Sequence, residues 1–381
     1  MVEVLTAIGL MSGTSMDGID VALVRTDGVD IVERGPNAEF AYDQEFRNLL
    51  SRAISDAKTM TDRNARPGSL VESESQLTQR HVEVVDSFLQ QNGLTDSDID
   101  IIGFHGQTVL HRPEIGLTVQ LGDGSELAVA TGINVMADMR AADMVAGGQG
   151  APLAPAYHRA MASKIDLRPV VFVNIGGVGN VTFIGADDTL IAFDTGPGNV
   201  LVDEWVKAHA GLPFDDGGKI AAGGTPDQAR IAAMLNNDYF AEGPPKSLDR
   251  YDFSADSVAG MNLADGAATL TAFTAASLSK AQAHFPQTPQ AWVICGGGAR
   301  NATLMGMLAA ELPGKVMTAN DIGLDSATIE AEAFAYLAVR SLKGLPLTFP
   351  GTTGIGQPVT GGVWHQSSLE RTPSSSRRMS R

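Results

Sequence analysis

Residues 8–24 read IGLMSGTSMDGIDVALV: an apolar run, a turn rich in glycine and hydroxyl groups, and a second apolar run. Ile19, Val21 and Leu23 occupy alternate positions, which indicates a strand with one buried face. The turn holds two glycines, three hydroxyl side chains and one carboxylate. A chain reversal alone needs one or two such residues. The stretch therefore predicts a hairpin whose turn does more than reverse the chain.

The same plan returns at residues 170–185, VVFVNIGGVGNVTFIG. Glycine supplies positive φ in ordinary hairpins, so a tight turn explains either hairpin taken alone. Two similar hairpins, one in each half of the chain, could face each other across a cleft. Together they favour phosphate binding by backbone N–H groups.

Strand and helix patterns alternate along the rest of the chain. Residues 70–92 show a helical apolar face that ends before Gly93. Residues 100–108 read as a strand ending in a glycine turn, and residues 190–209 and 291–312 each read as strand, turn and helix. Residues 324–344 read as a helix that ends at Gly344. This alternation predicts the α/β class.

Composition narrows the class of protein. The chain has 381 residues, of which 44% are hydrophobic and 19% charged, so we expect a globular protein of two or three domains. A formal charge of −17 argues against nucleic-acid and anionic-membrane partners, although backbone N–H groups can still bind an anion. Cys295 is the single cysteine, which excludes an intrachain disulfide and a cysteine-only zinc site. The first residues show neither a signal peptide nor a membrane span, and a cytoplasmic protein is expected.

Familiar nucleotide motifs do not match. In DDGGKIA, Ile220 follows Lys219 where a Walker A loop needs Ser or Thr. GGVGNV and GGGARN do not match G-x-G-x-x-G, which weakens a dinucleotide-binding hypothesis. In ICGGGARN, the strand is followed by Gly296, Gly297 and Gly298. Because glycine has no side chain, the backbone there can lie against a flat ligand such as adenine. A tight turn alone would need one glycine.

Asp194 ends an apolar strand in AFDTGPGN. In open α/β sheets the ligand crevice lies beyond the carboxyl ends of strands, where a carboxylate can take a proton from a nucleophile. The alternative is a cap for the helix that begins near Asn199. Asn199 could cap that helix itself, so we favour the functional interpretation of Asp194.

The sequence leaves the roles of Arg140, Glu330 and Glu332 open. Arg140 could clamp a carboxylate with its planar fork, or pair with Asp138 or Asp143. Glu330 and Glu332 lie in an otherwise apolar helix, and their spacing does not say which of them faces solvent.

FHGQTVLHRP contributes His105, Gln107, Thr108 and His111. The histidines are not at a helical metal spacing, so a zinc site is weakly supported. Polar lining of a sugar site and a structural turn explain this stretch about equally well.

Seven motifs taken together resemble the anhydro-N-acetylmuramic acid kinase family, which belongs to the larger sugar kinase, Hsp70 and actin group. They occur in the family's order: GLMSGTSMDGID, HGQTVLHRP, DMRAADMVAGGQGAPLAP, VNIGGVGNVT, FDTGPGN, CGGGARN and EAEAFAYLA. The resemblance implies an actin-like, sugar-kinase fold with a duplicated ribonuclease H-like core and a deep interdomain cleft. It implies a first domain of residues 1–140 plus 345–365, with the N-terminal phosphate hairpin and sugar-site loops. The second domain would span residues 141–344, and residues 366–381, rich in Ser and Arg, are expected to be a disordered tail.

The resemblance also implies an activity and its residues. ATP and Mg²⁺ would serve to open the 1,6-anhydro ring of 1,6-anhydro-N-acetylmuramic acid and phosphorylate O6, giving N-acetylmuramic acid 6-phosphate in cell-wall recycling. Asp194 would be the catalytic base. The ATP-binding residues would be Gly13, Thr14, Ser15, Met16, Asp17, Gly18, Ile19, Asp20, Gly176, Gly177, Gly179, Asn180, Gly296, Gly297 and Gly298. The sugar-binding residues would be His105, Gln107, Thr108, Arg140 and Glu330. The Mg²⁺ ligands stay unnamed, with Asp17 kept for the nucleotide or its hydrated metal, and a homodimer is expected.

Three alternatives stay open at this point. An ordinary sugar kinase would use Asp194 on a free hydroxyl, with no ring to open. An ATP-driven scaffold or chaperone would need a peptide-binding region, and none is evident after residue 345. A degenerate sugar-binding module conflicts with the intact Asp194 and both hairpins.

Overall fold

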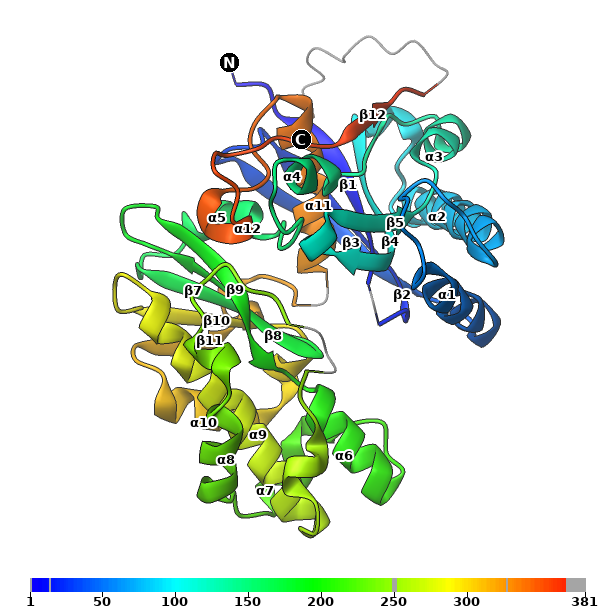
Figure 1. Ribbon diagram of the computed structural model, residues 1–381. Coiled ribbons are helices and arrows are strands. Elements are labelled where there is room, and N and C mark those ends of the chain that lie inside the picture. Colours follow the sequence, from blue (N-terminus) through cyan, green and yellow to red (C-terminus); the bar gives the residue numbers. More distant parts are fainter. Residues whose placement is uncertain (1, 14, 249–251, 327, 368–381) are drawn as a thin grey trace. The chain divides into compact units, whose positions relative to one another are not determined.

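The structure is a computed structural model that describes residues 2–13, 15–248, 252–326 and 328–367 (Figure 1). The chain divides into two compact units. The first comprises Met1–Ala160, Glu330–Phe349 and Ile355–Arg381, and the second comprises Met161–Ile329 and Pro350–Gly354. The domain bounds that the resemblance implies stay a prediction, and most of the expected tail lies outside the described residues.

The first unit is built on a seven-stranded mixed sheet with the path β12-β6-β4-β1-β2-β3, to which β5 adds by pairing with β4. The first three strands form an antiparallel meander, β4 runs parallel to β1, and β6 runs parallel to β4. The strands are β1 (Leu5–Ser12), β2 (Gly18–Thr26), β3 (Val32–Ala41), β4 (Ile101–Arg112), β5 (Leu117–Leu121), β6 (Val135–Ala137) and β12 (Val363–His365).

Helices cover both faces of this sheet. Its helices are α1 (Gln44–Ala57), α2 (Leu70–Gln91), α3 (Gly124–Thr131), α4 (Ala141–Val145), α5 (Pro155–Ala162) and α11 (Ile329–Leu342). Ile8 and Leu10 join a core with α1 and α2, whereas Gly9, which points to the opposite face, lies against α11. A Cβ on Gly9 would lie 1.7 Å from the carbonyl oxygen of Ala331, so only glycine lets α11 approach β1 this closely.

The second unit has a five-stranded sheet with the order β11-β10-β7-β8-β9. Here too a three-stranded antiparallel meander is extended by two parallel strands, so the order repeats that of the β6-β4-β1-β2-β3 part of the first sheet. The strands are β7 (Val170–Ile175), β8 (Val178–Ile184), β9 (Leu190–Pro197), β10 (Ala291–Cys295) and β11 (Lys315–Thr318). Both predicted glycine hairpins are confirmed, and so is the α/β class.

Most helices of the second unit lie in the connection from β9 to β10. The helices are α6 (Val200–Ala210), α7 (Lys219–Ala222), α8 (Gln228–Leu235), α9 (Leu263–Lys280), α10 (Ala302–Glu311) and α12 (Pro350–Thr353). The middle of α9 is buried nearly all round, packing on Phe193 and Ile294 of the sheet on one side and on Trp205 of α6 on the other. A helix buried on all sides has no polar stripe, and α9 accordingly reads as a run of Ala, Thr and Leu.

One strand is longer than expected. The strand predicted to end in a turn within residues 100–108 continues through Gly106 as β4 and reaches Arg112. Gly106 takes a φ of +69° inside the strand, and a Cβ there would lie 2.3 Å from the carbonyl oxygen of Leu121. The glycine therefore serves the close approach of β5, and the predicted turn at this position is wrong.

Candidate active site

The N-terminal glycine loop joins β1 to β2. Thr14 lies outside the described residues. The N–H of Met16 donates to the carbonyl oxygen of Gly13 at 3.1 Å, and Met16 has a φ of +54°. The Ser15 hydroxyl donates to the Asp17 carboxylate at 2.7 Å, on the exposed side of the loop. Within the described part of the chain, the N–H groups of Gly13 and Ser15 donate to no backbone carbonyl, so they are open to an anion.

A buried amide holds this loop in place. The hydroxyl of Ser12 donates to Gln107 Oε1 at 2.6 Å, and Gln107 Nε2 donates to the carbonyl oxygen of Gly13 at 3.0 Å. The hydroxyls of Ser12 and Tyr42 lie 2.8 Å apart, and the N–H of Tyr42 donates to the carbonyl oxygen of Asp17 at 2.8 Å. Gln107, predicted to line a sugar site, thus has its amide engaged by the loop, and a sugar contact from it stays a prediction.

The last three residues of the predicted ATP loop begin β2. Ile19 is buried in the core, so only its backbone faces the loop. A Cβ on Gly18 would lie 2.4 Å from the carbonyl oxygen of Phe40, so the glycine is required by β3. Asp20 lies opposite Met11 of β1.

The second glycine hairpin turns at Gly176 and Gly177. Their carbonyl oxygens accept the N–H groups of Gly198 and Asn199 at 2.8 Å, which ties the start of α6 to the turn. In the described residues, the N–H groups of Gly176 and Gly177 themselves donate to no backbone carbonyl. This turn therefore also offers two backbone donors to an anion.

Asn199 stands at the N-cap of α6, but its side chain does not form the capping hydrogen bond that we considered possible. Its Nδ2 donates instead to the carbonyl oxygen of Ile175 at 3.1 Å, so it holds the end of β7.

The glycines after β10 divide into two kinds. Gly296 has a φ of +73° and a Cβ there would lie 2.4 Å from Asn174 Oδ1, while a Cβ on Gly298 would lie 2.5 Å from the Cβ of Ile175. Packing in the second unit therefore requires both residues to be glycine. A Cβ on Gly297 would meet only Asn199 Nδ2, at 3.5 Å. Three glycines are consequently not evidence for an adenine surface by themselves, and that contact stays a prediction.

Asp194 lies in β9 beside the second hairpin. It pairs with Asn180 of β8, which pairs in turn with Asn174 of β7, so the three side chains form a row on one face of the sheet. Thr195 is an extra residue between this pair and the next, a bulge of the kind that re-aims side chains near active sites. The structure thus brings Asp194, Asn180, Gly179 and the Gly176 turn together.

The segment from Tyr239 to Leu248 holds Asp194 at three points. The Tyr239 hydroxyl donates to the carbonyl oxygen of Asp194 at 2.5 Å, and the N–H of Asp194 donates to the carbonyl oxygen of Lys246 at 3.1 Å. The N–H of Leu248 donates to the Asp194 carboxylate at 2.9 Å. Burial raises the pKa of Asp194 to about 6, against the opposing effect of the Leu248 N–H. Such a carboxyl can accept a proton near neutral pH. Sequence reasoning missed this segment, which shows no periodicity and no familiar motif.

In the first unit, His105 and Arg140 are in contact. His105 Nδ1 lies 3.2 Å from the carbonyl oxygen of Ser12, and Arg140 Nη2 lies 3.0 Å from His105 Nε2. The imidazole is therefore neutral, donating from Nδ1 and accepting at Nε2, in agreement with a pKa that burial and the Arg140 charge lower to about 3. Arg140 Nη1 donates to the carbonyl oxygen of Gly150 at 2.8 Å, and its Nε is buried without a partner in the described chain. The ion pair that we considered between Arg140 and Asp138 is absent, because Asp138 pairs with Arg63 at 2.7 Å.

The structure separates the two glutamates of α11. Glu332 is the buried one: its carboxylate accepts Arg34 Nη2 at 2.6 Å and the Tyr157 hydroxyl at 2.5 Å. Glu330 is half-buried, and burial raises its pKa while the nearby Arg140 charge lowers it. The charge of Arg140 therefore acts on Glu330, whereas Glu332 belongs to the packing of the unit. Thr108, the remaining predicted sugar residue, accepts a hydrogen bond from Gln120 in β5.

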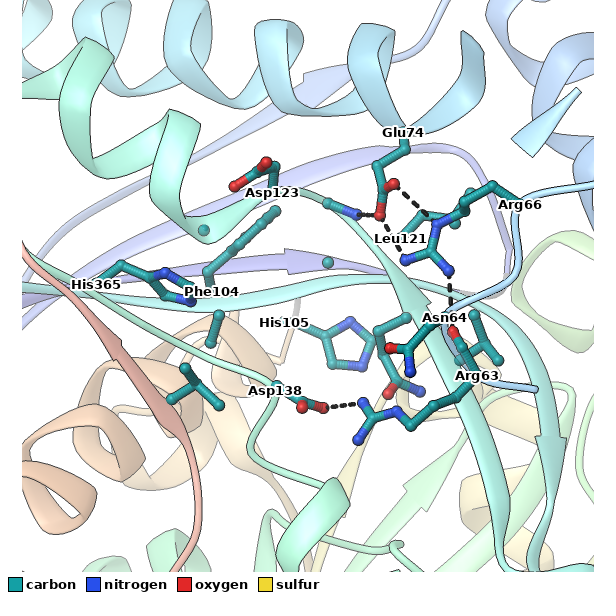
Figure 2. Close-up of a pocket in the computed structure, with 17 residues that line it drawn as sticks. Arg63, Asn64, Arg66, Glu74, Phe104, His105, Leu121, Asp123, Asp138 and His365 are labelled. Atoms are coloured by element: carbon teal, nitrogen blue, oxygen red, sulfur yellow. Dashed lines mark hydrogen bonds and ion pairs between the residues drawn. The ribbon is translucent and has the colours of Figure 1, made fainter. Parts of the chain in front are cut away.

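A cavity of about 350 Å³ lies in the first unit, between β4, β6 and the residues before α2 and α3 (Figure 2). Figure 2 shows its two ion pairs, Arg63 with Asp138 and Arg66 with Glu74. Among the predicted site residues, only His105 lines this cavity. Both arginines already have a carboxylate partner, so the cavity is not a ready anion site.

No group of three or more His, Cys, Asp or Glu side chains among the described residues is placed to hold a metal ion. No helix in that part of the chain has the length and apolar character needed to cross a membrane.

The chain is a kinase, that is, a phosphotransferase with an alcohol acceptor. The chain belongs to the anhydro-N-acetylmuramic acid kinase family, whose model matches residues 5–366.

Curated relatives of the same family are similar to this chain over nearly their whole length. The anhydro-N-acetylmuramic acid kinase of Agrobacterium fabrum is 51% identical over 369 residues, covering 95% of this chain and 99% of the relative. That of Rhizobium etli is 54% identical over 361 residues, covering 94% and 98%. Among solved structures, a ROK family glucokinase from Streptomyces griseus in complex with glucose and AMPPNP has a TM-score of 0.40 at 13% identity, covering 87% of this chain and 99% of that one. The activator of the 2-hydroxyisocaproyl-CoA dehydratase from Clostridium difficile with bound ADPNP has a TM-score of 0.45 at 11% identity, covering 89% and 96%.

Proposed function

We propose that the chain is an ATP-dependent kinase of 1,6-anhydro-N-acetylmuramic acid, which opens the 1,6-anhydro ring and phosphorylates O6. The observation that carries this proposal is family membership over nearly the whole chain, with curated relatives at 51% and 54% identity. The product is N-acetylmuramic acid 6-phosphate, an intermediate of cell-wall recycling.

The proposed mechanism uses Asp194 as the base. Asp194 takes a proton from water, and the water oxygen attacks the anomeric carbon C1. The C1–O6 bond breaks with its electron pair passing to O6, which attacks the γ-phosphorus of ATP while the bond to the bridging oxygen breaks and ADP leaves. The pKa of Asp194, raised by burial to about 6, supports this role because the group is ionised at neutral pH and still basic enough to accept a proton.

Backbone donors would hold the nucleotide. The open N–H groups of Gly13 and Ser15, and those of Gly176 and Gly177, fit phosphate oxygens, and Gly297 leaves room for the adenosine. Arg140 would meet the lactyl carboxylate, and Glu330 would accept a hydrogen bond from the sugar or the attacking water. Because phosphoryl transfer passes through a loose transition state, positioning and charge neutralisation supply most of the rate.

The residues of the N-terminal loop fit a hydrated Mg²⁺. Asp17 presents an exposed carboxylate there, and the described chain has no cluster of three acidic or imidazole ligands that would form an all-protein cage. Mg²⁺ characteristically binds through one or two carboxylates, phosphate oxygens and water. We propose that Asp17 holds the hydrated ion, which would neutralise phosphate charge. We further propose that the protein is cytoplasmic and forms a homodimer. Analytical ultracentrifugation tests the homodimer.

An isotope experiment tests the coupled reaction. The enzyme is incubated with the anhydro sugar and ATP in ¹⁸O-water, and the product is analysed by mass spectrometry. One ¹⁸O at C1 and none in the phosphate group is expected. Unlabelled N-acetylmuramic acid 6-phosphate in the same water measures spontaneous exchange. Product that carries no ¹⁸O beyond this exchange contradicts ring opening by water, and ATP hydrolysis that ignores the sugar contradicts the kinase.

A further inference from the structure

Lys246 is a buried cation that has no acidic side chain in contact among the described residues. Lys246 is 8% exposed, and its ammonium forms no ion pair within the described chain. Nζ donates one hydrogen bond, to the carbonyl oxygen of Tyr239 at 2.8 Å. Burying an unpaired charge is costly, and an apolar side chain would fill this place without that cost. The contacts that this ammonium does make therefore indicate what the charge stabilises.

Two aromatic rings flank the ammonium. Nζ lies 4.5 Å from the centre of the Tyr239 ring and 5.7 Å from the centre of the Phe193 ring. Both distances fall within the range of cation–π attraction, which strengthens when the cation is desolvated. Lys246 thus links the Tyr239–Leu248 segment to β9 at the residue directly before Asp194.

The same segment makes every hydrogen bond that the described residues direct to Asp194 from outside the sheet. Tyr239 contacts its carbonyl oxygen, the backbone of Lys246 contacts its N–H, and Leu248 contacts its carboxylate. Loosening the segment would therefore change both the direction of the carboxylate and its proton affinity.

We propose that Lys246 is a positioning residue for Asp194: its ammonium joins Tyr239 to Phe193 and so holds the Leu248 N–H against the Asp194 carboxylate. The proposal rests on the proposed role of Asp194 as the base. Lys246 acts through Tyr239 and Leu248 and does not contact the reacting atoms.

Other charged groups surround this assembly and enter the design of the test. Glu242 is the acid whose charge opposes the effect of burial on Lys246. His284 lies edge-on to Phe193, and its pKa is lowered by burial and then by the Lys246 charge. Asp252 and Glu242 add to the rise of the Tyr239 pKa, after burial and Asp194. Because His284 also titrates, each variant is compared with and without His284→Gln.

The experiment measures the Asp194 carboxyl directly in the full chain, by ¹³C NMR across pH, together with kcat and KM. Lys246→Met keeps the apolar stem and removes the ammonium. We expect its Asp194 midpoint to rise above that of the parent chain, because the Leu248 N–H no longer stabilises the carboxylate, and kcat to fall by up to about 10²-fold with KM nearly unchanged. Lys246→Arg keeps a cation over both rings. It should bring both the Asp194 midpoint and kcat most of the way back to the values of the parent chain. Lys315→Met, at an exposed site on β11, should match the parent chain.

Each contrary result overturns the proposal. A Lys246→Met variant with unchanged midpoint and kcat, a loss of thermal stability alone, or a change confined to the KM for ATP would each do so. If Lys246→Met does not fold, Lys246→Gln keeps a donor to Tyr239 and removes the charge, and the same rise in midpoint is expected. The titration needs no turnover, so it remains decisive even if Asp194→Asn proves active and the base assignment fails.

Discussion

Ser12 and Gln107 are joined by a buried hydrogen bond of 2.6 Å, from the hydroxyl at the end of β1 to the side-chain carbonyl in β4. The amide nitrogen of the same Gln107 donates to the carbonyl oxygen of Gly13. One side chain thus fixes the first two residues of the N-terminal glycine loop, so the shape of that loop depends on a residue far away in the sequence.

Gln107→Glu tests this dependence. The carboxylate still accepts from Ser12, but it cannot donate to Gly13 and faces that carbonyl with a negative charge. We expect the KM for ATP to rise about tenfold, which corresponds to about 1.4 kcal/mol, the scale of one lost buried hydrogen bond. Steady-state kinetics measures the change, and Gln91→Glu at an exposed position is the control. An unchanged KM for ATP combined with lower thermal stability would show that the amide serves packing alone.

Asp194→Asn separates binding from chemistry. The asparagine keeps an acceptor for the Leu248 N–H but cannot take a proton at neutral pH. We expect kcat to fall about 10²–10⁴-fold while nucleotide affinity, measured by calorimetry, stays within a few-fold of the parent. Asp187→Asn, at an exposed site in the turn before β9, should keep full activity. Near-normal turnover of Asp194→Asn would remove this residue from the role of base.

The raised pKa of Asp194 has two consequences, one for the pH dependence of kcat/KM and one for the pH dependence of stability. Because the base must be ionised, kcat/KM should fall as the pH drops through about 6. A carboxyl whose folded-state pKa exceeds its unfolded value opposes folding above that pKa, and this penalty disappears as the pH falls toward 4. Asp194→Asn should therefore be more stable than the parent by about 1–3 kcal/mol at pH 7.5 and equally stable near pH 4. Urea unfolding at both pH values measures the difference, and a parent chain that is the more stable at pH 7.5 would contradict it.

Local patterns predicted part of this molecule well. Glycine turns between period-two apolar runs predicted both hairpins, and α2 ends at Gln91, one residue before the predicted end. The two glutamates of α11 could not be separated from sequence, because that helix contacts β1 on one side and packs Tyr157 against Tyr336 elsewhere. The partners of Asp194 were missed because Tyr239 and Leu248 reach it from a segment without periodicity. Contacts between distant segments depend on packing, which local spacing does not encode.

Glu332 and Glu330 form a matched pair for the next prediction. Glu332→Gln leaves Arg34 beside a neutral amide in a buried site and also weakens the hydrogen bond from Tyr157. We expect it to lower the free energy of unfolding by about 3–5 kcal/mol, since one partner of a buried ion pair is lost. Glu330→Gln should change stability by less than about 1 kcal/mol, because burial already disfavours its ionised form, yet it should reduce kcat. Denaturant unfolding and kinetics on both variants check this, and the reverse pattern would exchange the roles of the two residues.

Arg140→Lys tests whether the fork of Arg140, and not merely its charge, recognises the substrate. The guanidinium is held by His105 Nε2 and the carbonyl oxygen of Gly150, and its buried Nε has no partner among the described residues. A lysine keeps the charge but cannot make both anchoring bonds and a bidentate contact to a carboxylate. We expect the KM for the anhydro sugar to rise about 10–100-fold with the KM for ATP unchanged, as for the loss of one charge-assisted hydrogen bond. The control is the same measurement with 1,6-anhydro-N-acetylglucosamine, which lacks the lactyl carboxylate. The KM for this sugar should change little in the Arg140→Lys variant. Arg25→Lys, in an exposed ion pair with Glu33, should leave both constants unchanged. Equal losses on the two sugars would show that Arg140 supports the loop at Gly150 and does not bind the carboxylate.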